Sequence, residues 1–443
     1  MPKFKYCNRF PEGNLWDLPV CYSLLQQLNE TKMKKVLSLT TALTAVLLCG
    51  NAQAAGFHLR EQSSAAQGNA YAGATAGAEE NSYAYYNVAG LTRQKGTQFS
   101  AGASYIAPKA TAKNVKDANG NRDADVQNVV HAAISPNFAI SHQVNDKLFL
   151  GFSGNSPFGM ITKYDRDWVG SDHGVTSDVK TALFTPMAAY KATDKLSLGA
   201  GLQIQYVWAH LTNSAMNGAV KHVSASGNAL DFGYQLGAMY EFTDSTRMGV
   251  GYRSEIKHKI KGDMNASVPY PLLNQDISVR LTTPAMLSFG VYHDVNTRWA
   301  VMAEYQRVFW SSLKNLTFVG DQLNNGQYIS RVEEKWRDTN FYSIGTSYML
   351  DEQWKLRLGL AYDQSAVSVK HRTPRIPDTD RVWYSAGLSY QYNEHLSFNA
   401  AYTYMYAHKS HLDTALTGNA GRNVTADYTN SIKVFAFGLN YAF

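Results

Sequence analysis

Cysteine is missing from most of this sequence, because Cys7, Cys21 and Cys49 all lie within the first 54 residues. Residues 55–443 therefore form no disulfide, supply no thiolate nucleophile and build no cysteine-based metal site. A strong excess of one charge is missing too, since residues 55–443 contain 35 Lys and Arg against 32 Asp and Glu. So small a difference does not indicate a nucleic-acid-binding surface.

Long hydrophobic runs are equally scarce. One apolar stretch, at 36–49, follows two lysines and precedes Ala-Gln-Ala at 52–54. A basic start, a short apolar core and a small-residue cleavage site, in that order, are typical of a secretory signal peptide. We therefore expect 1–32 to be a wrongly assigned upstream extension, 33–54 to be the signal peptide, and Ala55 to begin the mature chain. Beyond the signal no run of about 18 apolar residues occurs, so we expect no transmembrane helix.

Catalytic motifs are also lacking. The sequence contains no G-x-S-x-G, no H-E-x-x-H and no P-loop. The nearest trio of histidines, His210, His222 and His258, does not have metal-ligand spacing. His131 or His142 with a strand serine would imitate an outer-membrane phospholipase, but no spacing fixes such a pair. We expect a protein that is not an enzyme and that uses neither a catalytic residue, a metal nor a cofactor.

What the sequence has in abundance is alternation. In WKLRLGLAYD (354–363) every even position is apolar or aromatic, and the odd positions include Lys355, Arg357 and Asp363. The same period recurs in 196–206, 230–242, 382–392 and 396–406. Period-2 alternation over ten or more residues predicts strands with one apolar and one polar face, longer than those of an ordinary sandwich. We expect the polar faces, which also carry Arg253, Glu255 and Lys257, to line a lumen.

Short polar turns divide these strands into pairs. They lie at 142–147, 191–196, 241–246, 293–298, 349–354 and 391–396, and each contains Asp, Asn or Glu. Longer loops, such as 112–127, 213–228 and 407–431, alternate with the turns. Six turns and one extra strand at each end predict 14 strands, near 97–111, 129–141, 147–164, 178–191, 196–212, 229–242, 246–263, 276–294, 298–319, 329–350, 354–369, 382–392, 396–408 and 432–443. This pattern is typical of an all-β antiparallel barrel in the Gram-negative outer membrane, closed because a sheet edge cannot be satisfied in lipid.

The two ends of the predicted barrel chain have distinct features. The final strand closes on Tyr441 and Phe443, which share a face. A terminal aromatic of this kind resembles the assembly signal of outer-membrane proteins, so we expect the barrel-assembly machinery as a partner.

The Gly- and Ala-rich residues 55–96 lack the strand pattern and precede the first strand. Because a 14-stranded lumen is wider than side chains alone can fill, we expect 55–96 to plug the barrel formed by 97–443.

The third predicted strand is interrupted by Gly154-Asn155-Ser156-Pro157-Phe158-Gly159. Proline cannot donate to a strand ladder, and glycine on each side loosens it. The segment either ends the strand early as a loop or forms a kink within it, and we favour the kink. A kink would open a gap in the wall toward lipid, which suits an apolar cargo.

These residues resemble the FadL-type outer-membrane long-chain fatty acid transporters. AGFHLREQSSAAQGNAYAG (55–73) is similar to the start of that family, while GYRSEIKHKIKG (251–262) and RIPDTDRVWYSAGLSY (375–390) are similar to its strands. The resemblance covers the mature chain and implies a fourteen-stranded barrel with an N-terminal hatch.

The resemblance also implies roles for particular residues. It places Phe57 and Leu59 in the hatch segment beside the inner binding pocket. The hatch motif falls on Asn87-Val88-Ala89, with Val88 where the family has proline. The third-strand kink falls on 154–159, and a lumenal aspartate falls on Asp363, among lumenal polar residues that include Arg357. The family has two basic residues near the ligand carboxylate. Asn213 occupies the first of these positions here, and Arg331 is the residue nearest to the second.

The leading hypothesis is passive uptake of long-chain fatty acids or similar hydrophobic molecules. External loops would capture the cargo, an apolar lumenal pocket would hold it, and the gap at the kink would release it sideways. Transfer of alkyl surface from water, at roughly 25 cal/mol per Å², would drive entry. We expect a monomer that contacts outer-membrane lipid and lipopolysaccharide and no nucleic acid. The alternatives are an aromatic-hydrocarbon channel of the same family and a general porin, with a surface adhesin as a further possible role.

Overall fold

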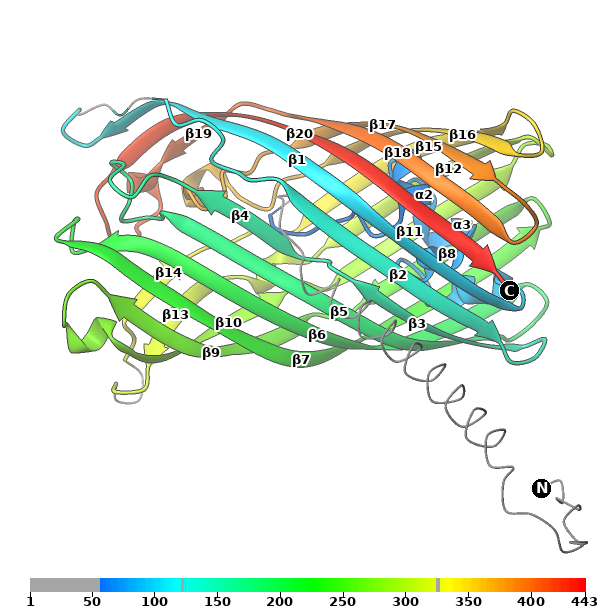
Figure 1. Ribbon diagram of the computed structural model, residues 1–443, viewed down its shortest axis with the longest axis horizontal. Coiled ribbons are helices and arrows are strands. Elements are labelled where there is room, and N and C mark those ends of the chain that lie inside the picture. Colours follow the sequence, from blue (N-terminus) through cyan, green and yellow to red (C-terminus); the bar gives the residue numbers. More distant parts are fainter. Residues whose placement is uncertain (1–55, 121–122, 124, 324–326) are drawn as a thin grey trace, which may run out of the picture. The chain divides into compact units, whose positions relative to one another are not determined.

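The computed structural model describes residues 56–443 except 121–122, 124 and 324–326. The predicted upstream extension (1–32), the signal peptide (33–54) and Ala55 lie outside the described residues. Within the described range the chain forms a short irregular segment followed by one large antiparallel sheet (Figure 1).

The strands, in chain order, are β1 (Thr97–Asp117), β2 (Ala133–Gln143), β3 (Leu148–Asn155), β4 (Gly159–Lys163), β5 (Thr176–Lys191), β6 (Leu196–Ala215), β7 (Val220–Thr243), β8 (Thr246–Arg253), β9 (Ile256–Ala266), β10 (Gln275–Thr283), β11 (Met286–Asp294), β12 (Trp299–Val308), β13 (Asn315–Gly320), β14 (Ser330–Glu333), β15 (Thr339–Met349), β16 (Trp354–Asp363), β17 (Arg381–Gln391), β18 (Leu396–Ala407), β19 (Ser410–Asp413) and β20 (Val424–Ala442). Short interruptions divide some wall strands into two labelled segments, such as β3 and β4 or β8 and β9. Counted as wall strands, these segments make the predicted 14.

The sheet closes on itself, as predicted. β1 pairs with β2 on one side and with β20 on the other, where Gln98 lies opposite Ala442 and Asp117 opposite Val424. The backbone N–H of Phe443 donates to the carbonyl of Thr97 at 2.9 Å. The first and last strands therefore share a continuous ladder, which removes the free edge that lipid would not tolerate.

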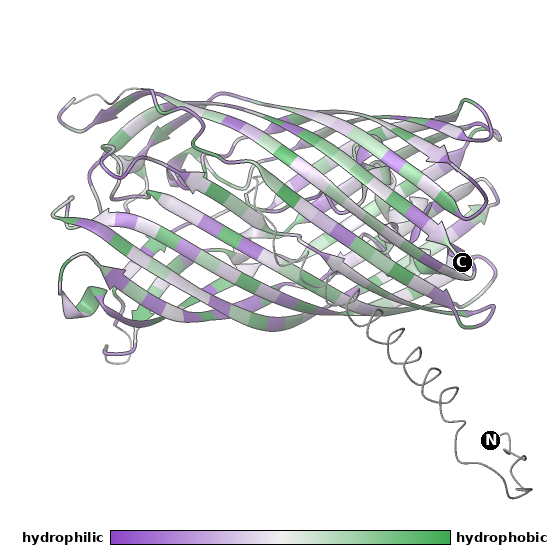
Figure 2. Cartoon of the chain, in the orientation of Figure 1, coloured by the Kyte–Doolittle hydropathy of each residue, from purple (hydrophilic) through white to green (hydrophobic). Residues whose placement is uncertain are grey.

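The apolar face of the alternating strands points outward, and the polar face points into the lumen. On β16, Leu356, Leu358 and Leu360 are exposed on the outer surface, while Arg357 and Asp363 are buried inside. Figure 2 shows hydrophobic and hydrophilic positions alternating along the strands. An outer apolar surface matches the hydrocarbon of a bilayer, so the alternation places the wall in lipid.

Two sequence-based expectations are wrong in detail. The region 213–228, predicted as an external loop, is mostly strand, because β6 continues to Ala215 and β7 begins at Val220. Lys257, predicted to line the lumen, points outward beside Glu255 at 3.0 Å. A break at 254–255 shifts the alternation by one position. The extension of β6 and β7 was missed because water reaches both faces of a strand beyond the membrane. The apolar alternation therefore ends before the strand does.

The lumen is filled by the segment 56–96. It contains α2 (Ser64–Gly68), α3 (Ala74–Gly77) and the 3-10 helices η1 (Asn81–Tyr85) and η2 (Val88–Arg93), and its residues are almost all buried. α2 and α3, drawn in blue, lie in the half of the barrel that carries the short turns and the C-terminus (Figure 1). None of the helices in the described residues is long and apolar enough to cross a membrane. We call residues 56–96 the hatch.

Glycines on the inner wall let the hatch backbone approach the strands directly. Glycines whose added Cβ would press on hatch atoms are Gly151, Gly199, Gly237, Gly249, Gly251, Gly290, Gly345, Gly359, Gly387 and Gly438. A Cβ on Gly359 would overlap the backbone of Asn69, and one on Gly199 would lie 2.6 Å from the backbone nitrogen of Ala89. Backbone of the wall and backbone of the hatch cannot yield as a flexible side chain can, so glycine is required at these contacts.

We predict that Gly359→Ala displaces the hatch from its contacts with the inner wall without unfolding the barrel. Amide hydrogen exchange in residues 64–77 should become at least tenfold faster, while heat-modifiable gel migration stays unchanged. Gly102→Ala is the matched control, because its Cβ would meet only neighbouring strands, at 3.0 Å or more. Equal exchange in the two variants would contradict the prediction.

Candidate functional site

The interruption of the third wall strand is paired with the hatch. β3 ends at Asn155 and β4 begins at Gly159. Leu59 N–H donates to the carbonyl of Pro157 at 2.8 Å, and Gly159 N–H donates to the carbonyl of Phe57 at 2.8 Å. Residues 57–59 therefore form a short antiparallel bridge with 157–159, centred on His58 and Phe158.

Side chains complete the pairing around Ser156. The Gln62 side chain accepts from Ser156 N–H at 3.1 Å and donates to the Ser156 carbonyl at 2.9 Å. On the opposite side, Phe158 N–H donates to the Thr181 hydroxyl of β5 at 3.0 Å. The backbone groups freed by the interruption are thus satisfied inside the lumen.

The wall ladder is open on the β2 side of the interruption. The pairing of β2 with β3 ends at Phe138 and Gly154, and the next bridge joins Val130 to Thr162. Between these two points the neighbour of the interruption is the hatch segment 57–59 rather than a wall strand. The sequence-predicted kink therefore coincides with a gap in the ladder that the hatch fills.

Phe57, at the start of the hatch, lies in an aromatic cluster. Its ring centroid is 5.0 Å from that of Trp310, 5.7 Å from Phe158 and 5.8 Å from Trp336. Trp310 begins the 3-10 helix η4 (Trp310–Ser312), between β12 and β13, and Trp336 lies between β14 and β15. The continuous strands predicted at 298–319 and 329–350 are therefore each interrupted, and both interruptions place a tryptophan in the lumen.

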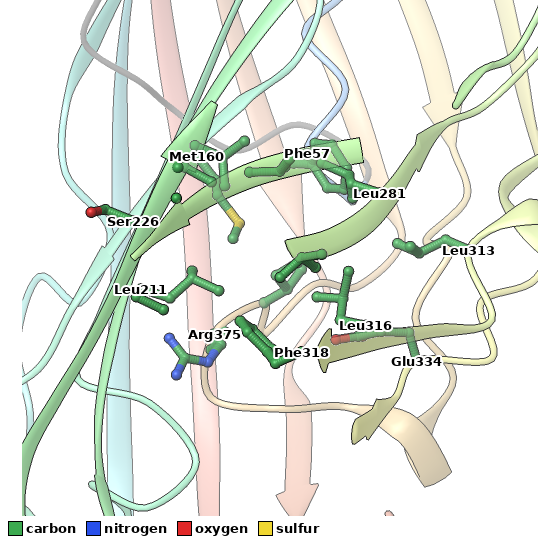
Figure 3. Close-up of a pocket in the computed structure, with 18 of the residues that line it drawn as sticks. Phe57, Met160, Leu211, Ser226, Leu281, Leu313, Leu316, Phe318, Glu334 and Arg375 are labelled. Atoms are coloured by element: carbon green, nitrogen blue, oxygen red, sulfur yellow. The ribbon is translucent and has the colours of Figure 1, made fainter. Parts of the chain in front are cut away.

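An apolar cavity adjoins this cluster, with about 790 Å³ of space when its open side is included (Figure 3). Phe57, Met160, Leu281 and Leu313 face the cavity, together with Leu316, Phe318 and other aliphatic side chains. The charged side chains on its lining are Glu334 and Arg375. A concave, largely apolar space with few polar groups is the usual form of a site for a hydrophobic small molecule.

A second, more polar cavity of about 1430 Å³ lies next to the first. It is lined by Arg331 and Asn213, among others, and shares Leu211, Ala225, Leu316, Phe318, Glu334 and Arg375 with the apolar cavity. The shared residues place the two spaces side by side. We call the apolar space the inner cavity and the polar one the outer cavity.

Arg375 lies where the two cavities meet. It belongs to the segment between β16 and β17, which folds into the lumen and buries Ala366, Val367 and Ile376. Its guanidinium donates to the Thr176 carbonyl and the Ser177 hydroxyl, each at 2.8 Å. Burial lowers the pKa of Arg375 to about 10, so the guanidinium remains charged at neutral pH. Sequence reasoning missed this residue. Ala366 and Val367 were assigned to the strand predicted at 354–369, but β16 ends at Asp363.

Asp363 anchors the hatch rather than lining either cavity. Its side chain is fully buried, 3.1 Å from the Arg60 guanidinium of the hatch and 3.7 Å from that of Arg381. Arg381 also lies 3.1 Å from Asp378, whose carboxylate accepts from the backbone N–H of Gly56 at 2.9 Å. This chain of charges ties the start of the hatch to β16 and β17.

Arg357 holds another part of the hatch. Its guanidinium contacts both carboxylate oxygens of Glu79, at 2.7 and 3.1 Å, and Lys355 contacts Glu79 at 3.0 Å. Burial alone would raise the pKa of Glu79, but the two cations outweigh it and hold that pKa well below its usual range. Arg357 and Lys355 lie on the inner side of β16, and their partner is Glu79 of the hatch.

The remaining predicted site residues fall away from the cavities. Asn87, Val88 and Ala89 pack against the wall: the Asn87 amide donates to the Ala238 carbonyl of β7 at 3.0 Å, and its oxygen accepts from Ala89 N–H at 3.0 Å. Leu59 is buried within the hatch core. Tyr441 and Phe443 lie exposed at the short-turn end of β20, with ring centroids 4.8 Å apart; a role in assembly stays a prediction.

A closed barrel with a filled lumen, an interrupted wall and an apolar cavity defines an outer-membrane channel for transport. A family model described as outer membrane protein transport protein (OMPP1/FadL/TodX) matches residues 45–443. The chain belongs to this family, and the resemblance inferred from the sequence is confirmed. It is an outer-membrane transporter with a multi-strand transmembrane barrel.

Individual relatives agree with this assignment. The chain is 30% identical to outer membrane protein P1 of Haemophilus influenzae, over 92% of this chain and 99% of the relative. It is 29% identical to a long-chain fatty acid transport protein of Escherichia coli, over 91% and 97%.

Two solved structures show the same fold. A Pseudomonas aeruginosa FadL homologue superposes with a TM-score of 0.79 at 25% identity, covering 88% of this chain and all of that one. A toluene transporter of Ralstonia pickettii has a TM-score of 0.61 at 21% identity, over 82% and 94%, and supports the fold alone.

We predict that Asp363→Asn loosens the start of the hatch. Removing the carboxylate leaves the buried Arg60 without its counter-charge, which costs about 3 kcal/mol. Hydrogen exchange in residues 56–63 should accelerate roughly 100-fold. Asp338→Asn is the control, since its ion pair with Arg307 is 3.0 Å long but half exposed and is worth under about 1 kcal/mol. Equal rates of hydrogen exchange in residues 56–63 of the two variants would show that Asp363 does not anchor the hatch.

Proposed function

We propose that this transporter takes up long-chain fatty acids passively and releases them sideways through the interrupted third strand. The observation that carries the proposal is the position of Arg375, a half-buried cation that lines both the polar outer cavity and the apolar inner one. A molecule with one anionic end and a long alkyl tail is complementary to that arrangement. Two relatives that match most of this chain are a long-chain fatty acid transport protein and outer membrane protein P1.

The alkyl tail supplies the driving force. Each methylene moved from water into the inner cavity contributes about 0.8 kcal/mol, so a chain of sixteen carbons gains on the order of 10 kcal/mol before ordering costs. A general porin would need a water-filled passage, whereas here the hatch occupies the lumen. No step consumes energy, so net movement follows the concentration gradient of the cargo.

The carboxylate is assigned to Arg375 rather than to Arg331. Arg375 lines both cavities, whereas Arg331 lines only the outer cavity and is exposed. A charged hydrogen bond is stronger where less water competes for it, so the half-buried guanidinium of Arg375 is a better partner than the exposed one of Arg331. An uncharged aromatic hydrocarbon, the alternative cargo, would form no charge-assisted hydrogen bond with this cation and would gain only the weaker cation–π attraction.

The exit follows from the bridge between the hatch and the kink. Phe57 faces the inner cavity, and the same short segment fills the gap in the wall ladder. Displacing residues 57–59 would therefore open the cavity toward the gap beside β2. In this mechanism the hatch segment is the gate, and lateral release needs no movement of the wall strands.

The cargo is tested with Arg375→Gln. We expect the variant to bind oleate 10- to 100-fold more weakly while its affinity for oleyl alcohol changes less than about twofold, because only the acid uses the charged contact. Titration of the purified protein in detergent measures both ligands. Arg331→Gln serves as the control and should change neither. A parallel loss of acid and alcohol would assign Arg375 a purely structural role, and equal wild-type affinity for both would favour a hydrocarbon channel.

The gate is tested with His58→Cys/Phe158→Cys. The hydrogen bonds flank this pair, which gives the non-hydrogen-bonded geometry with Cα atoms about 4.5 Å apart, suitable for a disulfide. We expect oxidation to abolish oleate uptake in a host lacking its own transporter and reduction to restore it. Each single cysteine variant is a control for the loss of the native side chain. Normal uptake through the oxidised, cross-linked protein would overturn lateral release past the hatch.

A further inference from the structure

Four cations gather on the outer face of the barrel, away from both cavities. Lys257, Lys259 and Lys261 occupy alternate positions of β9, and Arg280 lies on the adjacent β10; all four side chains point outward and are exposed. β9 and β10 lie in the half of the barrel that carries the long loops (Figure 1). We call these four residues the basic patch.

Three of the four cations of the basic patch have no ion pair within the described part of the chain. Lys259 is directly opposite Arg280 in the β9–β10 register, which places their Cβ atoms about 5 Å apart. Lys257 and Lys261 follow on the same face about 7 Å away on either side. Lys257 pairs with Glu255 at 3.0 Å, but no ion pair of the described residues involves Lys259, Lys261 or Arg280. Like charges directly opposite each other are destabilising, so this arrangement favours an external anion.

Acidic residues near the basic patch do not neutralise it. Asp263 and Asp276 form the directly opposed pair farther toward the loops. The Asp263 carboxylate accepts from Asn265 and Ser226, and it forms no ion pair with a patch cation.

The basic patch begins where the apolar outer surface ends. On the seventh wall strand, Met248, Val250 and Tyr252 face outward before the cations of β9 begin. On the eighth, Val291, Phe289 and Leu287 precede Arg280 in the same direction. At about 3.3 Å per residue and a tilt of about 40°, the eleven residues from Val291 to Arg280 rise roughly 28 Å along the membrane normal. This matches an apolar band about 25 Å tall, so the cations stand at its outer boundary.

We propose that the basic patch binds the phosphate groups of lipopolysaccharide in the outer leaflet. That lipid carries phosphates at the boundary between its acyl chains and its sugars, at the height where these cations lie. Lysine and arginine hold phosphate through charge-assisted hydrogen bonds, and clustered cations at a membrane surface recognise anionic headgroups. The lipid acyl chains would lie on the outward apolar residues of the same two wall strands. The site is independent of the cargo and of the gate.

The test compares two triple variants of the full-length protein in detergent. Lys259→Gln/Lys261→Gln/Arg280→Gln removes the unpaired cations of the basic patch. Lys147→Gln/Lys195→Gln/Arg298→Gln removes three exposed cations from the short-turn end, with the same change in charge. Both should keep heat-modifiable migration, because every altered side chain is exposed. Native mass spectrometry measures binding of lipopolysaccharide, of lipopolysaccharide stripped of its phosphates, and of inorganic phosphate.

We expect the patch variant to bind intact lipopolysaccharide roughly 100-fold more weakly than the wild type or the short-turn variant. Phosphate-free lipopolysaccharide should bind all three proteins alike, and inorganic phosphate should bind none measurably. Lys259→Arg/Lys261→Arg should retain wild-type binding, which separates charge from packing. Unchanged binding by the patch variant, or an equal loss in the short-turn variant, would overturn the site. Binding of inorganic phosphate at the patch would show an anion site that does not recognise the lipid.

Discussion

The close approach of the hatch to the inner wall is the constraint on which the rest of the structure depends. Glycines spread over many strands leave room for hatch backbone, and Arg60, Glu79 and Asn87 then reach partners on opposite sides of the lumen. Because the short-turn half is filled in this way, the inner cavity lies in the other half of the lumen, next to Phe57. The cavity, the aromatic cluster and the bridge to the kink all follow from the position of residues 57–59 at the start of the hatch. Transport depends on this packing, since an empty barrel of this width would conduct water.

Much of the barrel could be predicted from the sequence because strand alternation is a local property. The strand count, the turn ends, the outward apolar face and the pairing of β20 with β1 all follow from period-2 patterns and polar turns. The interruption at Pro157 was visible as well, since proline and glycine act on the backbone of their own strand. Interruptions at Trp310 and Trp336 were missed, although Val308-Phe309-Trp310 places three apolar residues in a row and breaks the period.

The site was less accessible to sequence reasoning because its contacts join distant positions. Asp363 and Arg357 were placed in the lumen, but their partners Arg60 and Glu79 could not be identified from alternation. Arg375 was missed because nothing local distinguishes a loop that folds inward from one that projects into water. The orientation of Lys257 depended on the two-residue break at 254–255, which shifts the alternation by one position and reverses every later side chain of the strand. Side-chain orientations that depend on the register of a strand, and contacts between residues distant in the sequence, could therefore be identified only from the structure.

The glycine contacts also set the order in which the molecule can be built. Gly438 accommodates Ser64, and the Gln67 amide donates to the carbonyl of Val434, 367 positions later in the chain. The hatch is made first, yet its binding surface exists only after the last strand has closed the ring. Such contacts have very high sequence separation and form slowly. Weakening the pairing of β1 with β20 would therefore also weaken the surface to which the hatch binds.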